Sequence, residues 1–159
     1  MTVMIRHMRG EEADAVADMV RRLATDIGVS VVPRLTGAAL REASDLIDVV
    51  VAEQGGQLCG ACLGLMTFST WRGQRGLYIV DLFVDGAMRG QNIGLKLLRE
   101  AARRAALRGA RFIKLEVDHA NPGAARFYSR LGFVKKDEDR LFILEQDRLG
   151  EFIAAGDGT

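Results

Sequence analysis

The chain has 159 residues, a length that favours one globular domain over two. With 48% hydrophobic and 27% charged residues it has the composition of an ordinary globular protein, which excludes a disordered or fibrous class. The 22 basic and 21 acidic residues leave a formal net charge of +1, so no broad positive field would attract nucleic acid or an anionic membrane.

The chain shows no sign of a membrane span or of a secretion signal. Its longest apolar stretch, residues 58–66, contains two glycines and is far shorter than the roughly 20 residues that cross a bilayer. Arg6, His7 and Arg9 occupy the positions where a signal peptide has its apolar core. We therefore expect a cytoplasmic protein with no membrane association.

Hydrophobic periodicity in the first half predicts strands and two helices. Alternate apolar residues indicate strands, whereas apolar residues three and four apart from Ala13 to Ile27 indicate one helical face. The expected elements are a strand at 3–8, a helix at 11–27, a short helix at 37–43 capped by Thr36, and strands at 47–52 and 57–68 joined by a hairpin at 53–56.

The second half has a different character, because a strand, a long helix and another strand follow one another. A helix between two sequential strands predicts a parallel β-α-β unit. The expected elements are a strand at 77–84, a helix at 93–108, a strand at 112–117, a helix at 122–131 capped by Asn121, closing strands near Val134 and at 141–144, and a frayed tail at 150–159.

Cys59 and Cys62 have the C-x-x-C spacing of some zinc and redox sites. No second Cys pair or Cys/His pair completes a tetrahedral set, and the two cysteines lie in an apolar run that is typical of a strand. We therefore interpret both as small buried residues and expect no metal site.

A turn that contains Gly86, Gly90 and Gly94 joins the strand ending at Val84 to the long helix. The first turn of a helix offers unpaired N–H groups and a partial positive charge, so this turn is suited to a phosphate or pyrophosphate, and Arg89 would add a full charge. The glycine and lysine spacing of the common nucleotide-binding loops is absent, which disfavours a nucleotide-binding module.

A second group of polar residues follows the neighbouring strand, from Asn121 onwards. Because the carboxyl ends of parallel strands meet at one edge of a sheet, both groups are expected at the same edge, where α/β sheets bind ligands. On the helix after Asn121, Phe127 fits the core stripe, while Tyr128 lies on another flank and directs its hydroxyl towards the strand ends.

These two segments resemble the signatures of the GNAT acetyltransferase superfamily, and the resemblance covers nearly the whole chain. In the pattern at the start of the long helix, Asn92 stands where the family usually has glycine, and asparagine tolerates left-handed backbone better than most residues. The longer pattern Asn-x-x-Ala-x-x-Phe-Tyr-x-x-x-Gly-Phe is matched in full from Asn121 to Phe133.

The resemblance implies an α/β (α+β) single-domain fold spanning residues 1–149, followed by a flexible tail at 150–159. It implies a mixed, mostly antiparallel sheet of about six or seven strands with a central parallel β-α-β unit, flanked by about four helices. It also makes a homodimer a fair expectation.

The resemblance further implies acetyl-CoA as co-substrate, a primary amine of a small molecule as acceptor, and no metal. The turn would bind the pyrophosphate, and the strand before it would pair with the pantetheine arm. The residues that this assigns to the co-substrate are Leu82, Phe83, Val84, Arg89, Gly90, Gln91, Asn92, Ile93, Gly94, Leu95, Asn121 and Phe127.

Acetyl transfer needs an acid for the leaving thiolate and a base for the ammonium. A tyrosine with a pKa near 10 stays protonated at neutral pH, so Tyr128 is the predicted acid. Asp81, Glu116 and Asp118 are candidate bases, of which we choose Asp81, acting through water. We interpret His119 as a surface residue, and His7 has no partner that the sequence identifies.

A finer resemblance, to the diamine (spermidine/spermine) acetyltransferase branch, rests on residues 69–71 and 77–84. That branch usually has glutamate where Val80 stands, which weakens the case for polyamines. Two alternatives remain open: a lysine side chain or protein N-terminus as acceptor, and an acyl-CoA-binding regulatory module without turnover.

Overall fold

The computed structural model describes residues 2–88 and 90–155. They form two compact units, Met1–Pro122 and Gly123–Thr159, and each is described by itself.

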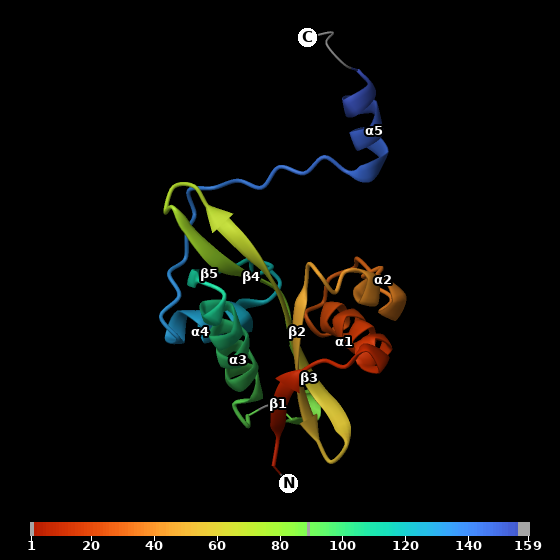
Figure 1. The fold of residues 1–159 in the computed structure, drawn as a ribbon, viewed down its shortest axis with the longest axis vertical. Coiled ribbons are helices and arrows are strands. Elements are labelled where there is room, and N and C mark those ends of the chain that lie inside the picture. Colours follow the sequence, from red (N-terminus) through yellow and green to blue (C-terminus); the bar gives the residue numbers. More distant parts are fainter. Residues whose placement is uncertain (1, 89, 156–159) are drawn as a thin grey trace. The chain divides into compact units, whose positions relative to one another are not determined.

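The first unit is built on a five-stranded sheet with the order β1-β2-β3-β4-β5 (Figure 1). Neighbouring strands are antiparallel except for β4 and β5, which run parallel. The strands are β1 (Met4–His7), β2 (Asp48–Gln54), β3 (Gln57–Ser69), β4 (Gln74–Val84) and β5 (Ala110–Leu115). The predicted mixed, mostly antiparallel sheet is therefore confirmed, with all its strands in sequence order.

Helices cover both faces of this sheet (Figure 1). On one face, the α1 face, side chains of α1 (Ala13–Asp26) and α2 (Gly37–Glu42) form the core with Leu63 of β3 and Phe83 of β4. The Thr36 hydroxyl accepts a hydrogen bond from the Ala39 N–H at 3.1 Å, which confirms the predicted cap.

On the opposite face, the α3 face, lies the long helix α3 (Ile93–Leu107). Its buried residues are Ile93, Leu97, Leu98, Ala101 and Ala105. A Cβ placed on Gly60 of β3 would lie 3.0 Å from Leu97 Cδ1, so glycine allows α3 to approach the sheet closely. Because α3 connects the parallel strands β4 and β5, the predicted β-α-β unit is confirmed.

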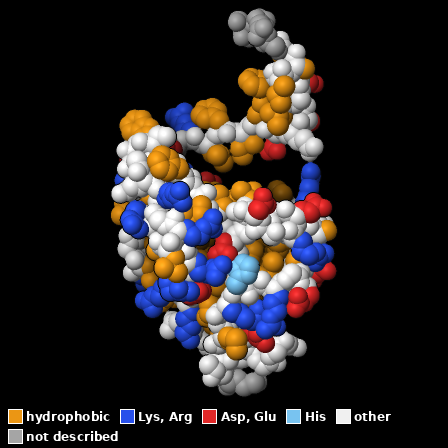
Figure 2. Space-filling model, viewed as in Figure 1, with side chains coloured by type: hydrophobic (Ala, Val, Ile, Leu, Met, Phe, Trp, Pro, Cys, Tyr) orange, Lys and Arg blue, Asp and Glu red, His pale blue; other side chains and the backbone are white. Residues whose placement is uncertain are grey.

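The second unit contains α4 (Pro122–Arg130), an irregular segment over residues 131–145, and α5 (Gln146–Ala154). Helix α5 overlaps the segment that the sequence assigned to a tail, and residues 156–159 of that tail lie outside the described part. Hydrophobic side chains gather on this helix (Figure 2), where Leu149, Phe152 and Ile153 are exposed.

The expected closing strands near Val134 and at 141–144 are not formed, so the described sheet has five strands and not six or seven. Their apolar side chains suit a strand, but a strand also needs hydrogen-bonding neighbours. Leu141 and Phe142 instead remain exposed. The helices also differ from expectation, because α5 brings their number in the described chain to five where about four were expected.

None of the helices described is both long enough and apolar enough to cross a bilayer.

Candidate functional site

Strand β4 has two halves with different neighbours. Its pairing with β5 ends at Ile79 opposite Leu115, whereas its pairing with β3 continues to Val84 opposite Gly60. We call residues 74–79 the paired half and residues 80–84 the open half. Backbone N–H and C=O groups need partners, so the β5 side of the open half is suited to an extended ligand that pairs as a strand does.

A bulge separates these halves and changes which face their side chains occupy. Val80 has no counterpart in the β3 register, because Ile79 pairs with Gly64 and Asp81 with Leu63. A Cβ on Gly64 would lie 2.9 Å from Leu77 Cδ1 and 3.6 Å from Ile79 Cδ1, which places these side chains on the α3 face. Beyond the bulge, Asp81 and Phe83 therefore lie on the α1 face, as Leu63 does.

Asp81 belongs to the open half and is half-buried, and burial raises the pKa of its carboxyl to about 6. A carboxyl with such a pKa is close to half-ionised just below neutral pH, which suits a general base. The role of Asp81 as the base stays a prediction.

The three residues expected to pair with pantetheine have different side-chain environments. Phe83 is 2% exposed in the core, and the Arg22 guanidinium lies 5.1 Å from the centroid of its ring. Leu82 and Val84 are half-buried. The pairing of these three residues with pantetheine stays a prediction.

The open half leads through Asp85 and a short 3-10 turn (Gly86–Met88) to the N-terminus of α3. Asn92, the N-cap, has φ 60° and ψ 24°, the left-handed geometry for which asparagine can replace glycine. The first bond of the helix runs from the Lys96 N–H to the Asn92 carbonyl at 3.0 Å. The N–H groups of residues 93–95 thus have no partner inside the helix, and its first turn contains no acidic residue.

The remaining residues predicted for the turn lie as follows. Gly90, with φ 87°, and Gln91 are exposed, Gly94 and Leu95 are half-buried, and Ile93 is 1% exposed in the core. Arg89 lies outside the described residues. The backbone amides at this helix start, next to the open half of β4, are suited to an anion.

Glu116, which directly follows β5, contacts β4 across the sheet. The Tyr78 hydroxyl donates a hydrogen bond to Glu116 Oε1 at 3.0 Å. Burial and the carboxylate of Glu116, with a further contribution from Asp81, raise the pKa of Tyr78. The sequence did not identify Tyr78 as part of this group, because the contact depends on the register between two strands 38 positions apart.

The other candidates in the loop after β5 have local roles. Asp118 Oδ1 accepts a hydrogen bond from the Ala120 N–H at 2.7 Å, which makes it a turn residue. His119 is exposed, as expected for a surface histidine. Asn121, half-buried, precedes α4.

Tyr128 and Phe127 belong to the second unit. The Tyr128 ring packs edge-on against the rings of Phe127, with centroids 5.1 Å apart, and Phe133, with centroids 5.4 Å apart. Phe127, Tyr128 and Phe133 are all half-buried. The structure thus gives Tyr128 its neighbours within that unit, and its proposed part in catalysis stays a prediction.

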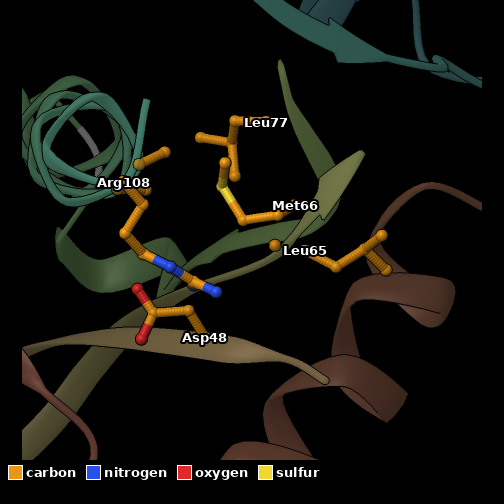
Figure 3. A pocket seen from close by; sticks show the side chains of 8 residues that line it. Asp48, Leu65, Met66, Leu77 and Arg108 are labelled. Carbon is orange, nitrogen blue, oxygen red and sulfur yellow. The ribbon is translucent and has the colours of Figure 1, made fainter. Parts of the chain in front are cut away.

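A charged cluster on the α3 side has a structural role. Asp48 accepts hydrogen bonds from Arg104 at 2.7 and 2.8 Å and lies 3.1 Å from His7 Nε2, the partner that the sequence did not reveal. Figure 3 shows the side chain of Arg108 directed towards Asp48. The neighbouring cavity measures about 10 Å³, room for roughly one water molecule. It is too small for a substrate.

Cys59 and Cys62 are both free thiols buried on β3. Burial raises the pKa of Cys59, and that of Cys62 to about 12, which disfavours the thiolate that a metal ligand or redox nucleophile needs. Among residues 2–88 and 90–155, no group of three or more His, Cys, Asp or Glu side chains could hold a metal ion.

Comparison with known proteins shows which family this chain resembles. Residues 17–133 match the Acetyltransferase (GNAT) family. Thialysine N-epsilon-acetyltransferase from Bos taurus is 28% identical over 142 residues, which cover 82% of this chain and 83% of the relative. The uncharacterized N-acetyltransferase MJ1207 of Methanocaldococcus jannaschii is 44% identical over 59 residues, 37% of this chain but only 26% of that protein.

The fold also occurs among solved structures. An integron cassette protein from the mobile metagenome of V. cholerae superposes with a TM-score of 0.77 and 19% identity, covering 96% of this chain and 98% of that one. At this identity the likeness concerns the fold alone. Together with the family match over residues 17–133, these findings show that the chain belongs to the acetyltransferase (GNAT) family and is an N-acetyltransferase.

Proposed function

We propose that the protein transfers the acetyl group of acetyl-CoA directly to the primary amine of a small molecule. The observation that carries this proposal is the open half of β4, which leads from a half-buried carboxylate to the amide-rich start of α3. A thioester carrier has the matching chemistry if its arm contains amides, which can pair with the backbone of the open half, and if it carries a pyrophosphate, which can bind the N–H groups at the start of α3.

In this arrangement the pantetheine amides pair with the backbone of Leu82, Phe83 and Val84. The pyrophosphate lies on the N–H groups at the start of α3, where the helix dipole favours negative charge. Arg89, Asn121 and Phe127 complete the proposed set as predicted from the sequence, together with the turn residues Gly90, Gln91, Asn92, Ile93, Gly94 and Leu95.

The chemical step forms a C–N bond and breaks a C–S bond. Asp81, through water, takes a proton from the ammonium so that the neutral amine can attack the thioester carbon. A backbone N–H of the open half stabilises the oxyanion that develops. The thiolate leaves with a proton from Tyr128, and the second proton of the attacking nitrogen then restores the Tyr128 hydroxyl. The products are the N-acetylated amine and CoA with a free thiol.

A small acceptor is supported by the thialysine acetyltransferases among the relatives. The diamine branch has a glutamate where this chain has Val80, which is 41% exposed at the bulge. Polyamines are therefore disfavoured as acceptors.

We further propose that the protein is a homodimer in the cytoplasm. The dimer is supported by the apolar side chains that remain exposed in the second unit, among them Phe142 and Phe152. The free thiols of Cys59 and Cys62 fit a reducing compartment. The near-balanced charge, with Lys/Arg and Asp/Glu side chains interspersed in Figure 2, argues against nucleic acid as a partner.

The test measures free thiol released from acetyl-CoA across a panel of small amines, lysine-containing peptides and protein N-termini, beside calorimetric titration of acetyl-CoA. The proposal expects binding together with thiol release that depends on a small amine. Release with peptides alone would favour a protein acetyltransferase. Tight binding without any amine-dependent release would instead indicate an acyl-CoA-binding regulatory module.

A further inference from the structure

The α1 face of β4 and β5 continues beyond the residues that the proposed reaction uses. Tyr78 pairs with Lys114 in the parallel register, so both side chains lie on the same face, and the Tyr78 hydroxyl contacts Glu116. Asp81 lies on this face too, beyond the bulge. The carboxylates of Glu116 and Asp81 therefore lie at or near the open half, and Lys114 lies two positions before Glu116 along β5, away from the open half.

Lys114 forms part of the wall of a hollow of about 220 Å³ at the β3–β4 hairpin, which we call the distal hollow. Arg72 and Phe112 also line it, with the Arg72 guanidinium 4.8 Å from the centroid of the Phe112 ring. The hydroxyl groups of Thr67, Ser69 and Thr70 add hydrogen-bonding groups to the wall.

The charges of the distal hollow are not neutralised by the protein. Within residues 2–88 and 90–155, neither Lys114 nor Arg72 forms an ion pair, and no acidic residue lines the hollow. Two cations with hydroxyl groups beside them are suited to an anion such as a carboxylate.

The distance between the carboxylates near the open half and Lys114 sets the size of a ligand that could contact both. Lys114 and Glu116 are two positions apart along one chain, which corresponds to roughly 6.6 Å for extended backbone. A lysine-like molecule, whose four-carbon stem separates its amine from the α-carbon, can bridge such a distance.

We propose that the acceptor is a zwitterion of the amino acid class, whose side-chain ammonium docks between Glu116 and Asp81 and whose carboxylate docks on Lys114 and Arg72 in the distal hollow. This inference rests on the proposed function, because it places the acceptor amine beside the open half of β4. It assigns Lys114 and Arg72 to acceptor specificity and Tyr78 to positioning Glu116.

The test compares L-lysine with cadaverine, which is lysine without its carboxylate, as acceptors for the wild-type protein and for Lys114→Met. We expect wild type to prefer lysine in kcat/KM. Lys114→Met should lower kcat/KM for lysine roughly tenfold, the scale of one charge-assisted hydrogen bond, through KM and without a change for cadaverine. Lys114→Arg should retain most of the preference.

Two further variants make the test specific. Arg111→Met removes an exposed charge from the same strand outside the hollow, and it should leave both acceptors unaffected. Glu116→Gln should raise KM for both acceptors, because both carry the ammonium. Unchanged affinity for acetyl-CoA and unchanged thermal unfolding would establish that each variant is folded.

The outcomes separate this inference from the proposed function. Equal or better use of cadaverine by wild type, or an equal loss for both acceptors in Lys114→Met, would overturn the inference and leave amine acetylation intact. Absence of thiol release with every amine of the panel would overturn both.

Discussion

The two halves of β4 differ in the strands that provide hydrogen-bond partners for their backbone N–H and C=O groups. The paired half, residues 74–79, has a strand on each side, whereas the open half, residues 80–84, has only β3. Side chains of the paired half, such as Leu77 and Ile79, pack in the core under α3. One strand thus provides both scaffold and binding site, and we expect substitutions in its two halves to have separable effects on stability and on chemistry.

The largest effect is expected at Asp81 in the open half. Asp81→Asn removes the proposed base and should lower kcat roughly 100- to 10,000-fold. Since burial raises the pKa of Asp81 to about 6, wild-type kcat/KM should fall tenfold per pH unit below that value, and the variant should lack this dependence. Asp118→Asn, in the turn after β5, is the control and should keep the wild-type profile. A normal rate for Asp81→Asn would assign the base elsewhere.

The same variant should be more stable than wild type above pH 6. The folded-state pKa of about 6 exceeds the ordinary aspartate pKa of 3.8, so ionising Asp81 costs folding free energy as pH rises between the two. Asp81→Asn should therefore increase the free energy of unfolding by at most about 3 kcal/mol at pH 8 and by almost nothing at pH 3. Urea unfolding at both pH values measures this, and lower stability at pH 8 would contradict the burial of an unpaired carboxylate.

The next largest effect is expected at Tyr128, which belongs to the second unit. Tyr128→Phe should lower kcat by about 10- to 1000-fold through loss of the acid, with acetyl-CoA affinity nearly unchanged. Steady-state kinetics and calorimetry measure the two quantities. Unaltered turnover would remove Tyr128 from the mechanism.

A smaller effect is expected where the open half leads into α3. Gly94→Glu places a carboxylate at the start of this helix and should weaken acetyl-CoA binding by about tenfold or more, because like charges repel there. Ala106→Glu adds the same charge near the other end of α3, where Ala106 is exposed, and should bind normally. Calorimetric titration that gives equal affinities for the two variants would place the pyrophosphate elsewhere.

The smallest effect on catalysis is expected next to the paired half. A Cβ at Gly64 would approach Leu77 Cδ1 to 2.9 Å and the Tyr78 carbonyl to 3.2 Å. Gly64→Ala should therefore reduce the free energy of unfolding by about 1–3 kcal/mol. Its kcat and acetyl-CoA affinity should stay at wild-type values at temperatures where it is folded. A large loss of kcat in the folded variant would show that the two halves are coupled.

Local patterns were sufficient to predict most of the first unit. The Thr36 cap, the helical face from Ala13 and the β-α-β unit all depend on residues close in sequence, and the structure contains each of them. Asn92 was expected to tolerate left-handed backbone, and it has φ 60°. The bulge at Val80 had no such signal, because residues 77–84 are apolar on both faces and conceal a change of register.

Features that depend on distant partners could not be predicted. The contact between Tyr78 and Glu116, and the convergence of Arg72 with Lys114, require the pairing of strands that are separated by a helix. The apolar pattern at 141–144 was interpreted as a strand because composition does not reveal whether a neighbour is present. Helix α5 lacks a side-chain N-cap, the usual signal of a helix start.

The central claim is that the open half of β4 pairs with the arm of acetyl-CoA, and hydrogen exchange of individual amides tests it most directly. By NMR, exchange at Leu82 and Val84 should slow at least about tenfold when acetyl-CoA is bound, because new hydrogen bonds protect these amides. Leu77 and Ile79, already paired on both sides, should change little. Saturating acetyl-CoA that leaves exchange across residues 80–84 unaltered would contradict the account.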